Sequence, residues 1–201
     1  MAALSLLIVA IMATGCTTDE SPPEQASQPA INPTGVVNLV GQPVDPLSGD
    51  NPTLLLFTRS DCPIANRFAP EIARLHKQYS AQGLEFYLVY VDPSESVADI
   101  RKHIADYKLS SPALRDPQHQ LVKRTSVRIT PEAALFDKQG KLVYRGRIDD
   151  RFVNFNKTRP QPTKHDLEDA IQGVLDGSLT ELVTTKAVGC YISDLEPADA
   201  G

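Results

Sequence analysis

The chain has 201 residues, about one folded domain, and with 41% hydrophobic and 22% charged residues it has the composition of a globular protein rather than a disordered one. Its 20 Lys and Arg against 25 Asp and Glu give a net charge of −5 without a basic block, which excludes the electrostatic footprint of a nucleic-acid-binding protein. Three cysteines, Cys16, Cys62 and Cys190, are too few for a disulfide scaffold or a cysteine-rich metal cage.

Residues 1–15 predict an export signal. An uncharged apolar run over residues 2–13 ends in the small residues Thr14 and Gly15, directly before Cys16. This pattern resembles a bacterial lipoprotein signal, in which cleavage after Gly15 leaves Cys16 as the lipidated N-terminus. An ordinary cleaved signal peptide, with Cys16 incidental, is the alternative. No apolar run reaches the roughly 18 residues of a membrane-spanning helix, so we expect membrane attachment only through this lipid anchor.

Residues 16–35 predict a disordered linker. They are rich in Pro, Ser, Thr and Gln, and contain too few apolar side chains to bury a core. Such a tether would hold a folded domain, expected over residues 36–192, away from a membrane, and residues 193–201 are expected to form a polar C-terminal tail. The signal and the linker together predict a location on the periplasmic side of a bacterial cell envelope. That compartment is oxidising, so a disulfide formed there persists.

The expected domain alternates strand-like and helix-like segments. Continuous apolar runs at residues 54–57 and 84–91 predict strands that are buried on both faces. Between them a helix is predicted to begin at Pro63 and to contain Pro70, because its apolar residues recur three or four positions apart: Ile64, Phe68, Ile72, Leu75 and Tyr79.

The later elements follow the same alternation. They are a helix over residues 97–107, a short strand at 113–115, a helix over 118–125, a β-hairpin with strands at 133–137 and 142–144, and a final helix over 167–175. The order β-α-β-α-β-α-β-β-α predicts an α/β fold with a mixed sheet and helices on both faces.

Two motifs give this order a family resemblance. Cys62-Pro63 follows a buried strand and begins a helix in which Pro70 lies eight residues after Cys62, and Ile129-Thr130-Pro131 directly precedes the predicted hairpin. This arrangement resembles the thioredoxin-like superfamily and, within it, a bacterial AhpC/TSA-type redoxin subfamily whose members also end in a Gly-Cys pair, here Gly189-Cys190. The resemblance covers residues 36–192. It implies a three-layer α/β/α sandwich with a mixed central sheet, and a cis-proline at Pro131.

Cys62 is the predicted nucleophile. A cysteine at a helix N-terminus lies near unpaired N–H groups and the positive end of the helix dipole, both of which favour the thiolate that attacks in disulfide exchange. Arg59 and Arg67 lie close enough in the chain to favour the thiolate further, whereas the adjacent Asp61 works against it. The resemblance implies that Thr130 and Pro131 offer backbone groups to an extended substrate.

Cys190 is the expected resolving thiol. Thioredoxins use Cys-x-x-Cys, but here the fourth position holds Ala65, so no disulfide forms within this motif. Cys190 lies in a polar segment after the last predicted helix, and a mobile tail brings a distant thiol back at modest loop-closure entropy. A structural or unpaired thiol is the alternative for Cys190.

The run Arg145-Gly146-Arg147-Ile148-Asp149-Asp150-Arg151 has two interpretations. One is a strand end with paired charges. The other places Arg145 or Arg147 near the catalytic face as an electrostatic aid to the thiolate, with Gly146 leaving room for close backbone approach beside the active site.

These residues favour an exported thiol–disulfide oxidoreductase that acts on a thiol or disulfide protein and needs no cofactor or metal. A thiol peroxidase acting on peroxide is one alternative, since peroxiredoxins belong to the same wider family. Their Pro-x-x-x-Thr-x-x-Cys motif is not present, because Leu55 and Arg59 occupy the Pro and Thr positions.

A copper-binding or assembly protein is the other alternative. Copper(I) prefers thiolates and imidazoles, but in the Cys-x-x-x-Cys pair of such proteins the second cysteine is replaced here by Asn66. Only Cys62, Cys190 and His119 remain as ligands. The other histidines, His76, His103 and His165, are predicted to be solvated.

Overall fold

A computed structural model describes residues 35–193 of the chain. The predicted signal peptide, the lipidation site at Cys16, nearly all of the predicted linker, and residues 194–201 of the predicted tail lie outside the described residues. Among the described residues, no helix combines the length and the apolar character that crossing a membrane requires.

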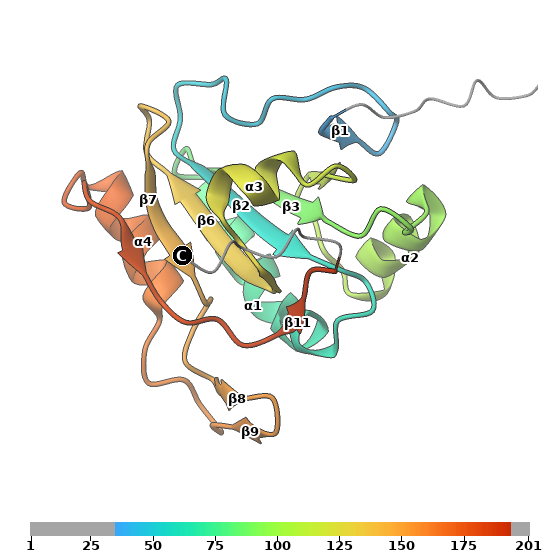
Figure 1. Ribbon diagram of the computed structural model, residues 1–201. Helices are drawn as coiled ribbons and strands as arrows, with labels where there is room; N and C mark the ends of the chain where they lie inside the picture. The colour runs from blue at the N-terminus through green and yellow to red at the C-terminus, as the bar shows by residue number, and fades with distance from the viewer. Residues whose placement is uncertain (1–34, 194–201) are drawn as a thin grey trace, which may run out of the picture. The chain divides into compact units, whose positions relative to one another are not determined.

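A seven-stranded mixed sheet forms the centre of the domain, in the order β1-β4-β3-β2-β6-β7-β10 (Figure 1). Its strands are β1 (Val37–Asn38), β2 (Thr53–Thr58), β3 (Glu85–Tyr90), β4 (Ala113–Arg115), β6 (Glu132–Phe136), β7 (Leu142–Gly146) and β10 (Val183–Thr184). Strand β2 pairs in parallel with β3 and antiparallel with β6. All six residues of β2 are buried, as expected for a central strand that is covered on both faces.

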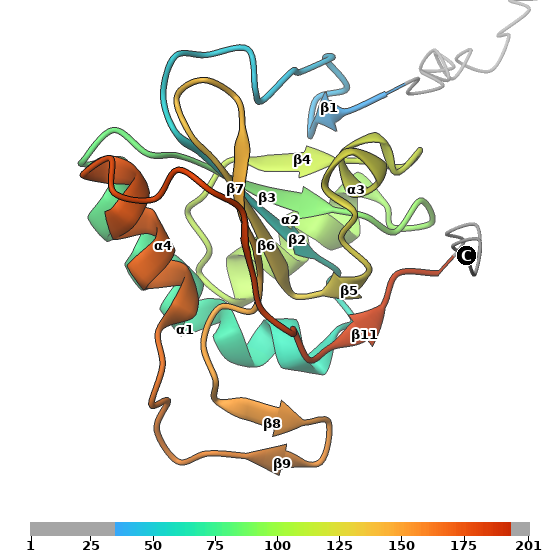
Figure 2. The ribbon, with the colours of Figure 1, turned by 60° about the vertical axis from the view of Figure 1, so that its left-hand side comes forward.

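Helices cover both faces of this sheet (Figures 1 and 2). Helices α1 (Pro63–Ser80), α2 (Val97–Asp106) and α4 (Asp166–Leu175) contribute buried side chains to one apolar cluster, together with Leu54 and Leu56 of β2. Helix α3 (Gln120–Thr125) packs on the opposite face, in a cluster with Leu55 and Phe57. Successive β2 side chains alternate between the two clusters because strand side chains alternate between faces. The predicted three-layer α/β/α sandwich is confirmed.

Two small antiparallel pairs lie outside the main sheet. Strand β5 (Ile129–Thr130) pairs with β11 (Cys190–Tyr191), and β8 (Phe152–Asn154) pairs with β9 (Lys157–Thr158). The register of the first pair sets Cys190 directly opposite Thr130. In Figure 2 this pair lies at the same end of the molecule as one end of α1.

The segment around Cys190 is therefore an ordered strand, and the predicted mobile tail is wrong for these residues. The backbone N–H of Ile192 donates to the carbonyl of Arg128 at 3.0 Å, which extends the pairing of β11. The side chain of Ile192 is only 6% exposed and packs in the cluster that contains Leu55 and Phe57. Sheet pairing and apolar burial both hold β11 in place.

Candidate active site

Cys62 is the N-cap of α1. Strand β2 ends at Thr58, and a turn in which the N–H of Cys62 donates to the carbonyl of Arg59 at 3.4 Å leads into the helix. Pro63 occupies the first helical turn, where its fixed φ is already helical. The N–H of Ala65 donates to Cys62 Sγ at 3.5 Å, and this contact stabilises negative charge on the sulfur. The local arrangement predicted for the nucleophile is present.

The cis-proline loop lies against Cys62. The Thr130–Pro131 peptide bond is cis, as the resemblance implied. Cys62 Sγ donates to the carbonyl of Thr130 at 3.0 Å, and the hydroxyl of Thr130 donates to the carbonyl of Cys190 at 3.5 Å. Thr130, itself fully buried, contacts both cysteines. The binding of a substrate by Thr130 and Pro131 stays a prediction.

Cys190 is the immediate neighbour of Cys62, although the two are far apart in the sequence. Both are free thiols; Cys62 is fully buried and Cys190 half-buried. Burial raises the pKa of Cys190 above its ordinary value, and the adjacent Cys62 thiol raises it further. The carboxylate of Asp61 acts in the same direction, whereas Arg59 opposes it. Cys190 consequently keeps its proton more strongly than an ordinary cysteine.

Gly189 allows β11 to approach β5 this closely. A Cβ atom at Gly189 would lie 2.0 Å from the carbonyl oxygen of Thr130 and 2.7 Å from its carbonyl carbon. Any other residue would therefore overlap the backbone of the cis-proline loop. The sequence singled out Gly189 only through the family resemblance, and this contact gives the physical reason for the glycine.

A network of side-chain hydrogen bonds fixes the backbone of Ser60, two residues before Cys62. The N–H of Ser60 donates to Glu95 Oε1 at 2.7 Å, and its carbonyl accepts from Asn66 Nδ2 at 2.9 Å. The Oδ1 atom of Asn66 is 2.8 Å from His103 Nε2, and His103 Nδ1 is 2.7 Å from the hydroxyl of Tyr90. Both polar groups of the Ser60 backbone are thus fixed by side chains.

The sequence analysis missed this network, and its prediction of a solvated His103 is wrong. His103 is 6% exposed, and burial lowers its pKa, which favours the neutral ring. It lies three residues after the fully buried Ile100, on the inner face of α2, and that spacing was an available signal. Burial also raises the pKa of Glu95, whose Oε2 atom is buried without a hydrogen-bond partner among residues 35–193.

The two predicted supporting arginines have different surroundings. Arg59 forms salt bridges of 2.9 Å with both Asp61 and Asp92, and its charge lowers the pKa of Cys190, so it lies beside the thiols. Arg147 instead forms a 2.8 Å salt bridge with Asp166, the first residue of α4.

The run over residues 145–151 therefore matches the interpretation as a strand end with paired charges. Arg145 donates to the carbonyls of Thr125 and Ser126. The segment that approaches Gly146 closely is Thr185 and not the active site. The Oγ1 atom of Thr185 would lie 2.1 Å from a Cβ atom at Gly146. Arg147 pairs with Asp166, so its contacts do not provide the predicted electrostatic aid to the thiolate.

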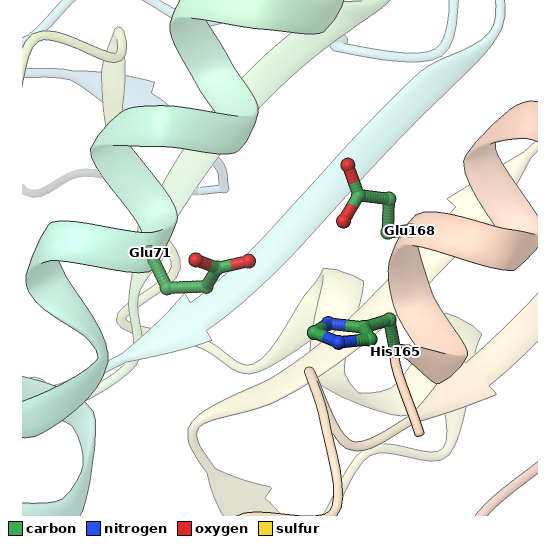
Figure 3. Close-up of side chains that lie close together, drawn as sticks. All are labelled: Glu71, His165 and Glu168. Carbon is green, nitrogen blue, oxygen red and sulfur yellow. The ribbon is translucent and has the colours of Figure 1, made fainter. Parts of the chain in front are cut away.

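Within residues 35–193, one cluster of side chains has the spacing of a metal site: Glu71, His165 and Glu168, with ligand atoms within 4.8 Å of one another (Figure 3). Glu71 extends from α1, and the other two come from the start of α4. Arg74 already donates to both carboxylates, at 2.6 Å each, so a guanidinium fills the position that a cation would take.

The ligand set considered for copper is not assembled among these residues. The one cluster with metal-site spacing contains neither Cys62 nor Cys190. His119 is buried, and its Nε2 atom donates to the carbonyl of Val91 at 2.8 Å.

Comparisons with known proteins give one family and a set of similar structures. The AhpC/TSA family matches residues 38–145, more than half of the chain. No curated protein sequence matches. A crystal structure of an uncharacterized conserved protein from Geobacillus kaustophilus is similar with a TM-score of 0.68 and 24% identity, covering 82% of this chain and 89% of that one.

Two further structures extend the likeness. A putative thioredoxin from Neisseria meningitidis has a TM-score of 0.54 and 19% identity over 70% of this chain and 86% of its own. A secreted Mycobacterium tuberculosis disulfide oxidoreductase, described as homologous to Escherichia coli DsbE, has a TM-score of 0.50 and 19% identity over 71% of this chain and 94% of its own. At these identities the likeness concerns the fold.

Proposed function

The chain belongs to the AhpC/TSA family and has a thioredoxin-like fold, and from this premise we propose that it is a thiol–disulfide oxidoreductase whose redox centre is the pair Cys62 and Cys190. The observation that carries the proposal is the contact of both cysteines with Thr130. The thiol of Cys62 donates to the Thr130 carbonyl, and Cys190 lies opposite Thr130 in the β5–β11 pair. Two adjacent thiols can store two electrons by opening and closing a disulfide, without a cofactor.

Cys62 is the attacking sulfur in the reduced protein. The N-terminus of α1 and the N–H of Ala65 favour its thiolate. This thiolate attacks a disulfide of a partner protein, forming a mixed disulfide and releasing one partner thiolate. Cys190 then attacks Cys62 Sγ and gives its proton to the released thiolate. The second partner sulfur leaves, and the Cys62–Cys190 disulfide remains. The cis-proline loop at Thr130 and Pro131 would bind the partner segment.

We assign this reaction to the periplasmic side of a bacterial cell envelope. The support is the apolar run over residues 2–13, the Gly15-Cys16 junction and the Pro-rich residues that follow. A lipid on Cys16 would attach the protein to a membrane, and residues 16–35 would separate the redox domain from that membrane.

The first experiment counts thiols by peptide mapping after oxidation with diamide. Cys62 and Cys190 should both resist alkylation in oxidised wild-type protein, because they have formed a disulfide. Turnover in a disulfide-exchange assay should be lost in Cys62→Ala, and Cys190→Ser should accumulate a mixed disulfide on Cys62. The Cys16→Ser variant is the matched control and should keep full turnover. Two alkylatable thiols in the oxidised protein, or turnover in Cys62→Ala, would contradict the proposal.

A thiol peroxidase is the second candidate, and membership of the AhpC/TSA family favours it. The position of the peroxiredoxin threonine holds Arg59, whose guanidinium is engaged by Asp61 and Asp92. We therefore expect disulfide exchange to be faster than hydrogen peroxide consumption under the same thiol supply. The reverse order of the two rates would favour the peroxidase.

A further inference from the structure

We infer that an external thiol reduces the oxidised protein by attacking the sulfur of Cys190, with Cys62 as the leaving group. The inference rests on the proposed Cys62–Cys190 redox pair. It concerns the other half of the cycle, in which a reducing partner opens the disulfide.

Access to the two sulfurs differs. Cys62 is 0% exposed, with its sulfur between the Ala65 N–H and the Thr130 carbonyl. Cys190 is half-buried, and its neighbour Tyr191 is 77% exposed, so β11 lies at the surface of the site. A nucleophile that approaches from solvent meets Cys190 before it meets Cys62.

We expect the same difference in access in the oxidised state. Strand β11 is held by its pairing with β5, by the bond from Ile192 to Arg128, and by the buried side chain of Ile192. The disulfide adds a covalent link between β11 and the first turn of α1. In the dithiol state that link is absent, and only the pairing with β5 and the contacts of Ile192 hold β11 over Cys62, so attack on a substrate disulfide requires these contacts to open.

The leaving-group chemistry selects the same sulfur. When a thiolate attacks one sulfur of a disulfide, the other sulfur leaves as a thiolate, and a better stabilised thiolate leaves faster. If Cys62 is the leaving group, its thiolate forms at the N-terminus of α1, where it accepts a hydrogen bond from the Ala65 N–H. If Cys190 were the leaving group, its thiolate would form where burial and the carboxylate of Asp61 raise its pKa. Steric access and leaving-group stability therefore both select attack at Cys190.

A dithiol supplies the two electrons that reduction of the Cys62–Cys190 disulfide requires. The first thiolate of the partner forms a bond to Cys190 Sγ while the Cys190–Cys62 bond breaks, and that electron pair stays on Cys62. The second thiolate of the partner then attacks the partner sulfur of the mixed disulfide and releases Cys190, which takes up a proton. The partner ends as a disulfide and this protein as a dithiol. The reducing partner is thus a dithiol protein that presents its thiolate to the solvent side of β11, beside Tyr191.

The test identifies the first adduct. Oxidised protein is mixed briefly with 2-mercaptoethanol, quenched with excess N-ethylmaleimide and mapped by mass spectrometry. We expect the hydroxyethyl disulfide on Cys190 and the maleimide on Cys62, at least tenfold more abundant than the opposite pattern. Equal amounts, or an excess of the opposite pattern, would overturn the inference. Thiols that remain alkylatable before 2-mercaptoethanol is added would instead reject the proposed redox pair itself.

Two variants separate shielding by β11 from a general change in reactivity. Ile192→Ala removes the buried anchor of β11 and should raise the fraction of adduct on Cys62 at least threefold. Tyr191→Ala removes a neighbouring exposed side chain and should leave that fraction at the wild-type value. A wild-type fraction in Ile192→Ala, or an equal rise in both variants, would refute the shielding of Cys62 by β11.

Discussion

Replacing Gly189 with alanine should separate the two cysteines and weaken their disulfide. The new Cβ would lie 2.0 Å from the Thr130 oxygen, whereas real Cβ contacts are essentially never under 3.0 Å. Thr130 is fully buried, and its carbonyl accepts the Cys62 thiol, so the cis-proline loop has little room to yield. Strand β11 must therefore move outward by about 1 Å, and it carries Cys190 with it.

The size of the effect follows from the strict geometry of a disulfide, which tolerates little displacement of its two Cα positions. A shift of about 1 Å in reacting groups commonly lowers an effective concentration by up to ~100-fold. We expect the equilibrium constant for closing the Cys62–Cys190 disulfide to fall about 10- to 100-fold. That change corresponds to a reduction potential higher by about 30 to 60 mV.

The assay equilibrates each protein in a series of glutathione redox buffers and counts unmodified thiols by alkylation and mass spectrometry. Gly49→Ala is the matched control, because no heavy atom lies within 4 Å of a Cβ at that position. It should keep the wild-type potential. A wild-type potential in Gly189→Ala as well would refute the reasoning that the close approach of β11 to Thr130 sets the redox pair.

Three other substitutions test the surroundings of the site. His103→Ala should lower the free energy of unfolding by about 2–3 kcal/mol in urea denaturation, because it leaves the buried Tyr90 hydroxyl unpaired; a loss below ~0.5 kcal/mol would contradict this. Burial raises the pKa of Glu95, so its contribution to stability is largest below the unfolded pKa of ~4.3 and is lost as the pH rises through the higher folded pKa. Wild-type protein should therefore lose Tm above pH 4 as Glu95 ionises, and Glu95→Gln, which cannot ionise there, should lack this loss. Coincident curves of Tm against pH for the wild type and Glu95→Gln would contradict this prediction. Arg147→Ala should leave disulfide exchange unchanged and lower stability by at most ~1 kcal/mol, because Arg147 pairs with Asp166; a tenfold slower exchange would restore its predicted electrostatic role.

The order of elements and the position of Cys62 were accessible from the sequence because both depend on local patterns. Apolar spacing of three or four residues predicted the buried face of α1, and all five residues assigned to it are buried. The continuous run of β2 predicted a strand covered on both faces. A cysteine followed by proline after such a strand predicted the N-terminus of a helix, and Cys62 is the N-cap of α1.

The predictions that were wrong concern partners that are distant in the chain. The spacing of His103 from Ile100 indicated the buried face of α2, but the groups that satisfy its two ring nitrogens, on Tyr90 and Asn66, leave no pattern in the sequence of α2 itself. Arg147 is directed to Asp166 by the packing of α4 beside β7, not by its neighbours in the chain.

The sequence by itself determined the thioredoxin-like order of elements and the position of Cys62 at the start of α1, since periodicity, proline and helix capping act over a few residues. Only the tertiary structure decided where Cys190 lies. Strand β11 has two residues, too few for a period of two to be detected, and its position depends on pairing with β5, on the burial of Ile192 and on the missing side chain of Gly189. Such contacts form only when segments some sixty residues apart, such as Thr130 and Cys190, are brought together by the packed sheet and helices, so no local pattern could place the second thiol.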